Sequence, residues 1–327
     1  MRRLTACEQV FPLANPFTIS RGTYTTSPVV EAVIEAEGFI GRGESFPYPH
    51  YGESMESVIA EIEGIADAVA QGAGRQELQS LLPPGAARNA VDCAFWDWEA
   101  KRAGQRAWSL AGLAAPPILT TAYTLSSGTP AEMAQAAAEH AARPLLKLKL
   151  MGDADDVARV AAVHAAAPAA QLIVDANEGA SPSNVAELSL ALGDHGVALI
   201  EQPVPAGQDA CLTRFDHPVP LCADESFHTL KDLDAIADCY EFINIKLDKT
   251  GGLTEALAVV AEAKRRGLRI MTGCMRGTSL AMAPATLIAA ASEVVDIDGP
   301  LLLAEDRPHG LVYQGSSVHP PPPELWR

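Results

Sequence analysis

The sequence is poor in positive charge and has no long apolar run. Lysine and arginine number 24 against 41 aspartates and glutamates, which gives a formal net charge of −17. Because such a charge repels polyanions at long range, we expect no nucleic-acid partner and no anionic-membrane partner. No stretch reaches the roughly 18 apolar residues that a membrane-spanning helix needs. Any acidic ligand must therefore be bound by positive charge gathered locally.

Paired cysteines are also missing. The six cysteines are scattered, form no C-x-x-C pair and lie mostly in apolar segments. This usage is typical of reduced core residues, so we expect a cytoplasmic protein. The N-terminal stretch MRRLTAC carries two arginines, but Glu8, Gln9 and Pro12 interrupt the apolar region that export requires, so we expect no signal peptide.

Residues 1–115 are predicted to form a small α+β domain. The alternating segments SPVVEAVIEAEG and FIGRGES indicate an antiparallel hairpin or meander. The segments SMESVIAEIEGIADAVAQG and ARNAVDCAFWDWEAKRAG carry apolar residues at helical spacing. The prolines of LAAPPILTT, near residue 116, mark the end of this domain.

Residues 116–298 repeat one pattern, in which a short apolar run ends in a polar residue and an alanine-rich segment follows. The polar ends of six consecutive runs fall 22 to 26 residues apart, which is the length of a βα unit. The eight runs are PILTTAY, PLLKLKL, QLIVDAN, VALIEQP, VPLCADES, FINIKLD, LRIMTGC and EVVDIDG. They predict parallel strands closed into a barrel, with the active site at the carboxyl ends of the strands.

No helix is evident after the eighth run. The predicted fold class is therefore α/β, a modified TIM barrel of (β/α)7β form with an N-terminal α+β capping domain. Residues 299–327 contain several prolines, which favour a stiff, non-helical terminus. We expect this segment to return to the capping domain.

Three consecutive strands end in the carboxylates Asp175, Glu201 and Asp224. Adjacent strands would bring them together at the barrel rim, where unpaired carboxylates raise one another's pKa. A divalent cation removes the repulsion, and a ligand set of oxygens alone favours Mg²⁺ before Mn²⁺ or Ca²⁺. Each acid could alternatively be a helix N-cap or part of a rim salt bridge. Three in succession favour the metal site.

Two lysines flank this acidic set, since Lys149 ends the strand before it and Lys246 ends the strand after it. A lysine near a cation and a second lysine has a lowered pKa and can act as a base near neutral pH. The alternative is an inner ion network with the three acids. Lys147 points to the same side as Lys149, because residues i and i+2 of a strand share a face.

The segments KLKL, VDAN, IEQP, ADES, INIKLDKTGG and DIDGPLLL resemble the enolase superfamily, in its muconate-lactonizing subgroup, and within it the dipeptide epimerases. In the first domain, PFTISRGTYTTSPVVEAVI and GESFPYPHYGES are similar to the L-Ala-D/L-Glu epimerases of murein recycling. The resemblance covers nearly the whole chain. It implies an Mg²⁺-dependent isomerase that inverts the Glu α-carbon of a small dipeptide through an enolate.

The resemblance also implies roles for matching residues. The three carboxylates would hold Mg²⁺ against the substrate carboxylate. Lys149 and Lys246 would be the two bases, one on each face of the α-carbon. Lys147 would stay cationic, helping to bind the substrate carboxylate and lowering the pKa of Lys149.

The substrate's other groups would meet a second set of residues. Asp296 and Asp298 suit the free α-ammonium of a dipeptide, although DIDG could simply form a turn. Arg21 matches the arginine that meets the glutamate side chain, and a guanidinium fits a carboxylate bidentately. The remaining expected substrate contacts are Thr124, Cys274 and Arg276.

Several alternatives stay open. Within the superfamily they are another dipeptide, an N-acyl amino acid epimerase or racemase, a cycloisomerase or an o-succinylbenzoate synthase. A different class is a Schiff-base aldolase that uses Lys246 as nucleophile. A non-enzymatic reading is a sugar- or peptide-binding barrel with a vestigial site. The sequence leaves open the homo-oligomeric state, the in vivo dipeptide, Mg²⁺ against Mn²⁺, and which lysine serves which stereoisomer.

Overall fold

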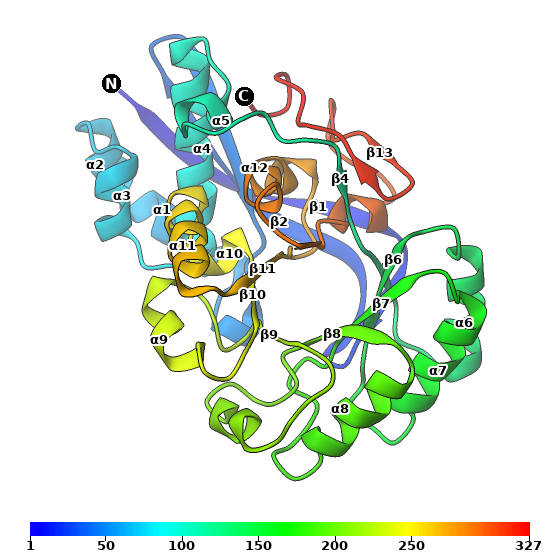
Figure 1. Ribbon diagram of the computed structural model, residues 1–327. Coiled ribbons are helices and arrows are strands. Elements are labelled where there is room, and N and C mark those ends of the chain that lie inside the picture. The colour runs from blue at the N-terminus through cyan, green and yellow to red at the C-terminus, as the bar shows by residue number, and fades with distance from the viewer.

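The computed structural model describes residues 1–327, and its first part is an antiparallel sheet covered by helices (Figure 1). The sheet has the order β1 (Arg3–Ile19), β2 (Gly22–Ala36) and β3 (Phe39–Ser45), and its helical segments are η1 (Pro49–Tyr51), α1 (Met55–Gly64), α2 (Ala66–Ala70), α3 (Arg75–Leu81), α4 (Ala86–Ala103) and α5 (Ala107–Leu110). The predicted hairpin and helices are confirmed.

Two glycines allow α4 to lie directly on β3. A Cβ atom on Gly41 would lie 2.2 Å from the backbone oxygen of Ala94, and one on Gly43 would lie 2.1 Å from that of Ala90. Any other residue at either position would push the helix away from the strand. A cluster of 18 buried hydrophobic residues fills the space between this sheet and its helices. The capping domain thus has a core of its own.

The second part contains eight parallel strands, with helices on the outside of the curled sheet (Figure 1). In sheet order from one edge to the other they are β5 (Tyr123–Leu125), β6 (Leu145–Lys149), β7 (Gln171–Asp175), β8 (Val197–Glu201), β9 (Leu221–Ala223), β10 (Phe242–Ile245), β11 (Arg269–Thr272) and β12 (Val294–Val295). The backbone N–H of Ala122 donates to the carbonyl of Val295 over 2.8 Å, so the two edges of the sheet meet. The predicted fold class is confirmed.

The helical segments of this part are α6 (Pro130–Glu139), α7 (Asp156–Ala166), α8 (Val185–Asp194), η2 (Asp209–Arg214), η3 (Leu230–Asp232), α9 (Leu233–Ile236), α10 (Leu247–Thr250), α11 (Leu253–Arg266), α12 (Ser279–Ala289) and η4 (Gly299–Leu302). The largest cluster of buried hydrophobic residues, 57 in number, joins them to the strands. None of the helices in the chain has both the length and the apolar character needed to cross a membrane.

The predicted position of the first barrel strand is wrong. The run PILTTAY was expected to form it, but only its last residue, Tyr123, belongs to the barrel strand β5. Leu119–Thr120 forms β4, which pairs with β14 (Ser317–Val318) in a separate sheet with β13 (Tyr313–Gln314). Because the partner comes from the far end of the chain, periodicity within the run could not reveal it.

The C-terminal segment contacts the first domain. The N–H of Ala304 donates to the carbonyl of Pro12, and the indole of Trp326 donates to the carbonyl of Cys93. Buried Arg307 donates to Glu31 over 3.0 Å and to Glu44 over 2.7 Å. The division into residues 1–115, 116–298 and 299–327 stays a prediction.

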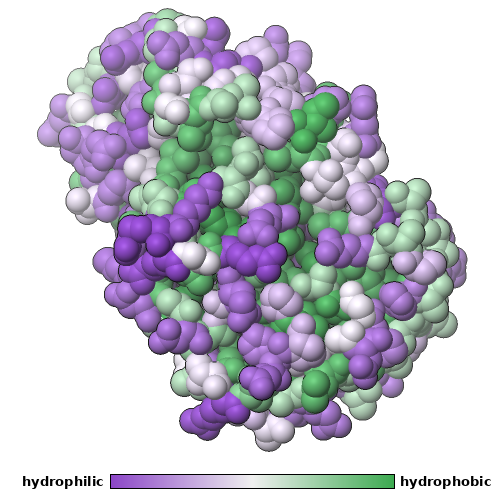
Figure 2. Space-filling model, in the orientation of Figure 1, coloured by the Kyte–Doolittle hydropathy of each residue, from purple (hydrophilic) through white to green (hydrophobic).

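The surface view shows two lobes (Figure 2). Apolar residues appear in the hollow between them (Figure 2). Polar residues cover much of the outer surface, with apolar residues among them along the edge of the lower lobe (Figure 2).

Candidate active site

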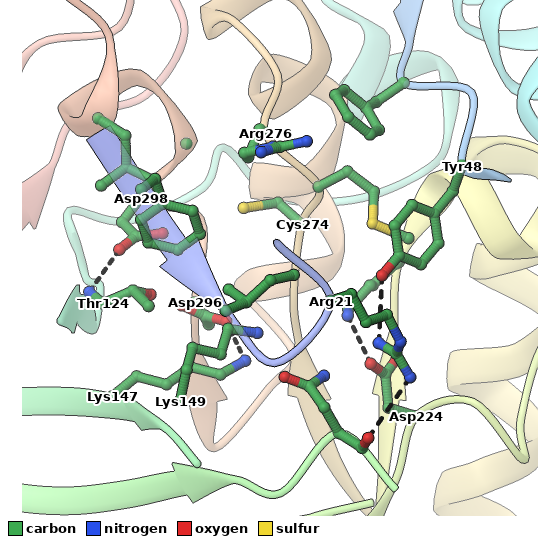
Figure 3. Close-up of a pocket in the computed structure, with 18 of the residues that line it drawn as sticks. Arg21, Tyr48, Thr124, Lys147, Lys149, Asp224, Cys274, Arg276, Asp296 and Asp298 are labelled. Atoms are coloured by element: carbon green, nitrogen blue, oxygen red, sulfur yellow. Dashed lines mark hydrogen bonds and ion pairs between the residues drawn. The ribbon is translucent and has the colours of Figure 1, made fainter. Parts of the chain in front are cut away.

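A cavity lies between the carboxyl ends of the barrel strands and the loops of the capping domain (Figure 3). Its volume is about 690 Å³, including the part open to solvent. The expected site residues that line it are Arg21, Thr124, Lys147, Lys149, Asp224, Lys246, Cys274, Arg276, Asp296 and Asp298. Asp175 and Glu201 are not on the wall, but they contact lysines that are. The structure therefore brings all the expected residues to one place.

The strand register places the three carboxylates together. In the parallel pairing, Asp175 of β7 lies opposite Glu201 of β8, and Asp224 follows directly after β9. One oxygen from each lies within 4.8 Å of the others, and all three residues are buried. Burial, followed by the charge of Asp175, raises the pKa of Glu201 to about 7. The three buried carboxylates therefore need positive charge nearby if all of them are to be ionised.

Lysines supply that charge. The Nζ of Lys147 lies 2.5 Å from Glu201 and 2.7 Å from Asp296, and the Nζ of Lys149 lies 2.5 Å from Asp175. Burial tends to raise the pKa of Asp175, but Lys149 and Lys147 lower it to about 2. The inner ion network that the sequence offered as an alternative is therefore present.

Lys246 lies on the other side of the carboxylates. Its Nζ is 2.6 Å from Asp224 and 3.7 Å from Glu201. Burial lowers its pKa, but Asp224 and then Glu201 outweigh burial and hold the pKa well above its usual value. The lowered pKa is expected for a lysine beside a bound cation and a second lysine, so it stays a prediction for the protein with its metal.

The donor set fits a hard divalent cation. It consists of three buried carboxylates from three neighbouring strands, with no sulfur or imidazole among them. Mg²⁺ prefers such oxygen ligands. The amide of Asn244, 2.8 Å from Glu201, and the backbone N–H of Asn177, 3.0 Å from Asp175, add neutral polar partners. Asp175, Glu201 and Asp224 are thus the residues that could hold the ion.

Two aspartates lie at the far wall of the cavity, just after β12. Asp296 pairs with Lys147, and Asp298 accepts a hydrogen bond of 2.7 Å from the backbone N–H of Thr124. Both side chains are buried. Burial, followed by the charge of Asp296, raises the pKa of Asp298 to about 6. A cationic group of a ligand would be stabilised between them.

The capping domain contributes Arg21 from the turn between β1 and β2. Its guanidinium lies 3.1 Å from the hydroxyl of Tyr48 (Figure 3). It also lies 2.8 Å from Glu178 and 2.9 Å from Glu225. Burial lowers the pKa of Arg21, but Glu225 and Tyr48 raise it above its usual value. The turn is therefore fastened to two loops of the barrel.

Comparisons with known proteins show the family of the chain. Residues 130–321 match the family model described as enolase C-terminal domain-like, and residues 1–112 match the mandelate racemase/muconate lactonizing enzyme N-terminal domain. These two models together cover more than half of the chain. The chain belongs to the enolase superfamily.

Curated relatives in this superfamily include epimerases and racemases. An L-Ala-D/L-Glu epimerase from Escherichia coli is 45% identical over 98% of this chain and 100% of its own length. An N-acetyl-D-glutamate racemase from Pseudoalteromonas is 43% identical over 91% of this chain and 95% of its own length.

Solved structures of superfamily members show the same fold. An enolase family member from Agrobacterium tumefaciens, with homology to dipeptide epimerases and with bound sodium and L-Ala-L-Glu, is 56% identical, covers 100% of both chains and has a TM-score of 0.97. A dipeptide epimerase from Cytophaga hutchinsonii, complexed with Mg and D-Ala-L-Val, is 26% identical over 97% of this chain and 93% of its own, with a TM-score of 0.88.

Sequence reasoning missed several residues of this candidate site. Lys249 is fully buried and donates to the side chain of Asp224 over 2.5 Å and to its carbonyl over 2.6 Å. Gln202 accepts the backbone N–H of Asp224 over 2.9 Å. Glu178 and Glu225 hold Arg21. Lys249, Gln202 and Glu225 lie inside quoted motifs, and Glu178 directly follows one. The neighbouring sequence does not show which way these side chains point.

Proposed function

We propose that the protein is an Mg²⁺-dependent dipeptide epimerase that inverts the Glu α-carbon of L-Ala-D/L-Glu, a peptide of murein recycling. The observation that carries the proposal is the placement of Lys149 at the end of β6 and of Lys246 directly after β10. The strands β7, β8 and β9 lie between them, and each ends in, or is directly followed by, one of the three carboxylates. A substrate centred over the carboxylates would then have one lysine on each face. The E. coli epimerase, 45% identical over 98% of the chain, supports the assignment.

The metal and the lysines would divide the work. Mg²⁺, held by the three carboxylates, would bind the substrate carboxylate and stabilise the negative charge that develops when the α-proton leaves. Positive charge at the carboxylates also opposes the ammonium form of a lysine beside it. Lys149 or Lys246, in its neutral form, takes the proton from one face of the α-carbon, and the other lysine, as ammonium, returns a proton to the opposite face. The centre is inverted and no proton is lost overall.

The remaining residues would orient the substrate. Asp296 and Asp298 bind the α-ammonium of the first residue, and Arg21 attracts the carboxylate of the Glu side chain. Thr124, Cys274 and Arg276 complete the wall of the cavity. All six cysteines are free, which suits a reducing compartment, so we infer a cytoplasmic enzyme.

The second candidate is an N-acetyl amino acid racemase, which the Pseudoalteromonas relative favours. An N-acyl substrate has no ammonium to place between Asp296 and Asp298, so we expect it to be the poorer substrate. Proton NMR in D₂O with Mg²⁺ tests both. L-Ala-L-Glu should lose its Glu α-proton signal and yield the D-Glu diastereomer faster than N-acetyl-glutamate racemises. Absence of exchange with every dipeptide tried would contradict the proposal.

A further inference from the structure

One end of the cavity holds an arginine tied to two glutamates. Arg21 is 2.8 Å from Glu178 and 2.9 Å from Glu225, and His50 adds a contact of 3.0 Å to Glu178. The side chain of Glu225 is only 3% exposed, and its second oxygen has no hydrogen-bond partner. The formal charge of the two carboxylates exceeds that of the one guanidinium. A carboxylate of a ligand must therefore compete with Glu178 and Glu225 for the guanidinium of Arg21.

The backbone holds one of these glutamates in place. Asn177 and Glu178 have φ values of +45° and +68°, in the left-handed region that residues other than glycine rarely adopt. Such conformations persist only where surrounding contacts enforce them, and they gather at functional sites. Here the bend directs Glu178 toward Arg21, which lies on the other domain.

A second arginine of the same cavity provides a contrast. Arg276 lies over the ring of Tyr24, with 3.5 Å between its Cζ atom and the ring centroid, and it has no carboxylate within ion-pair distance. One of its terminal nitrogens is buried without a hydrogen-bond partner. Removing Arg276 would take positive charge from the cavity without releasing any carboxylate, whereas removing Arg21 would release two.

We propose that Glu178 and Glu225 are specificity-determining residues, which compete with the substrate's side-chain carboxylate for Arg21 and form a latent site for a cationic second residue. The inference rests on the proposed epimerase function. An acidic side chain must draw Arg21 away from buried Glu225, which lowers the preference for Glu over a neutral residue. Without Arg21 the two carboxylates face the cavity unpaired, and a lysine side chain of the substrate would replace the missing guanidinium. The selectivity for the second residue is thus set by the competing Glu178 and Glu225 as well as by the attractive Arg21.

The test compares kcat/KM for L-Ala-L-Glu, L-Ala-L-Gln and L-Ala-L-Lys. In Arg21→Ala, the ratio for the Lys dipeptide over the Gln dipeptide should rise by roughly 100-fold, since a charged contact at close range changes affinity by one or two powers of ten. Adding Glu225→Gln to this variant should remove most of the rise. Arg21→Lys, which keeps the charge, should not show it.

Arg276→Ala is the matched control, because it removes an arginine of the same cavity that has no carboxylate partner. Its Lys over Gln ratio should rise far less than in Arg21→Ala, because the loss of Arg276 releases no carboxylate. An equal rise in Arg276→Ala, or an unaltered rise in the Arg21→Ala, Glu225→Gln double variant, would overturn the inference. Glu178→Gln alone is a second test. In this variant the ratio of kcat/KM for L-Ala-L-Glu over L-Ala-L-Gln should rise by about tenfold, because one competitor for Arg21 is lost.

The two proposals can fail separately. If the unchanged protein epimerises L-Ala-L-Glu and the ratios stay constant in the variants, only the specificity inference is wrong. If no dipeptide exchanges its α-proton, the epimerase function is wrong. In that case, calorimetric titration of Arg21→Ala with L-Ala-L-Lys in the presence of Mg²⁺ still measures the affinity of the proposed cation site. Binding no tighter than that of L-Ala-L-Gln would contradict the latent cation site.

Discussion

The ammonium of Lys147 lies 2.7 Å from the carboxylate of Asp296, which stands 149 positions further along the chain. The contact spans the barrel seam, because Lys147 belongs to β6 and Asp296 follows β12 at the edge of the sheet. The same ammonium is 2.5 Å from Glu201. One buried cation thus joins the proposed metal-binding carboxylates to the proposed ammonium-binding pair.

Replacing this lysine should destabilise the protein. In Lys147→Met, three buried carboxylates lose their shared cation, and we expect the free energy of unfolding to fall by about 3–5 kcal/mol. Urea denaturation measures the difference. Exposed Lys264 of α11 provides the control, since Lys264→Met should change stability by less than about 0.5 kcal/mol. Equal midpoints for both variants would show that Lys147 does not balance the cluster.

The two proposed bases give a stereochemical prediction. Lys149→Ala and Lys246→Ala should each lower the rate of epimerisation by about 10²–10⁴, because each removes the base from one face of the α-carbon. Each variant should still exchange the α-proton of one diastereomer in D₂O, and the two variants should differ in which one. NMR of L-Ala-L-Glu and L-Ala-D-Glu follows both events.

Lys231→Ala, at an exposed position outside the cavity lining, serves as the control and should epimerise at the unchanged rate. If either active-site variant kept full epimerisation, the two-base assignment would be incorrect. Loss of exchange for both diastereomers in both variants would instead indicate that the lysines act as one unit.

The barrel strands and most of the candidate site residues could be predicted from the sequence, because both follow from the repeat of βα units. Parallel strands in βα units bring their carboxyl ends to one edge, so residues that end successive runs, such as Asp175 and Glu201, must become neighbours. The spacing of the runs could not predict the strand at Leu119, because its partner Val318 comes from the far end of the chain. It also could not predict the role of Lys249, which follows the proposed base Lys246 in sequence but donates a hydrogen bond to Asp224 from a buried position.

Mg²⁺ should stabilise the protein through the three carboxylates. We expect the Tm to rise with MgCl₂, because a ligand that binds only the folded state stabilises it by mass action. Asp175→Asn should lose this rise together with activity, while EDTA should abolish the activity of the unchanged protein. Glu293→Gln, which alters an exposed surface carboxylate, should keep both responses. A Tm that is independent of Mg²⁺ in the unchanged protein would contradict the metal site.

Asp248 should make stability depend on pH. Its side chain is buried behind the active site, where one oxygen accepts the N–H of Phe46 and the amide of Asn89, each over 2.9 Å. Burial raises its pKa to about 7, above the value of about 3.9 for an unfolded chain. The folded state therefore holds more protons than the unfolded state between these two values, so this residue makes stability fall as the pH rises from about 4 to 7.

Asp248→Asn should remove that dependence, because an amide oxygen can accept both hydrogen bonds and an amide does not ionise. We expect the variant to match the unchanged protein near pH 4 and to exceed its free energy of unfolding at pH 8 by on the order of 2 kcal/mol. Urea titrations across this range measure the difference. Asp238→Asn, at an exposed position, should show a pH profile parallel to that of the unchanged protein. Parallel profiles for Asp248→Asn would mean that Asp248 ionises alike in both states, and hence that its burial is offset by the donors from Phe46 and Asn89.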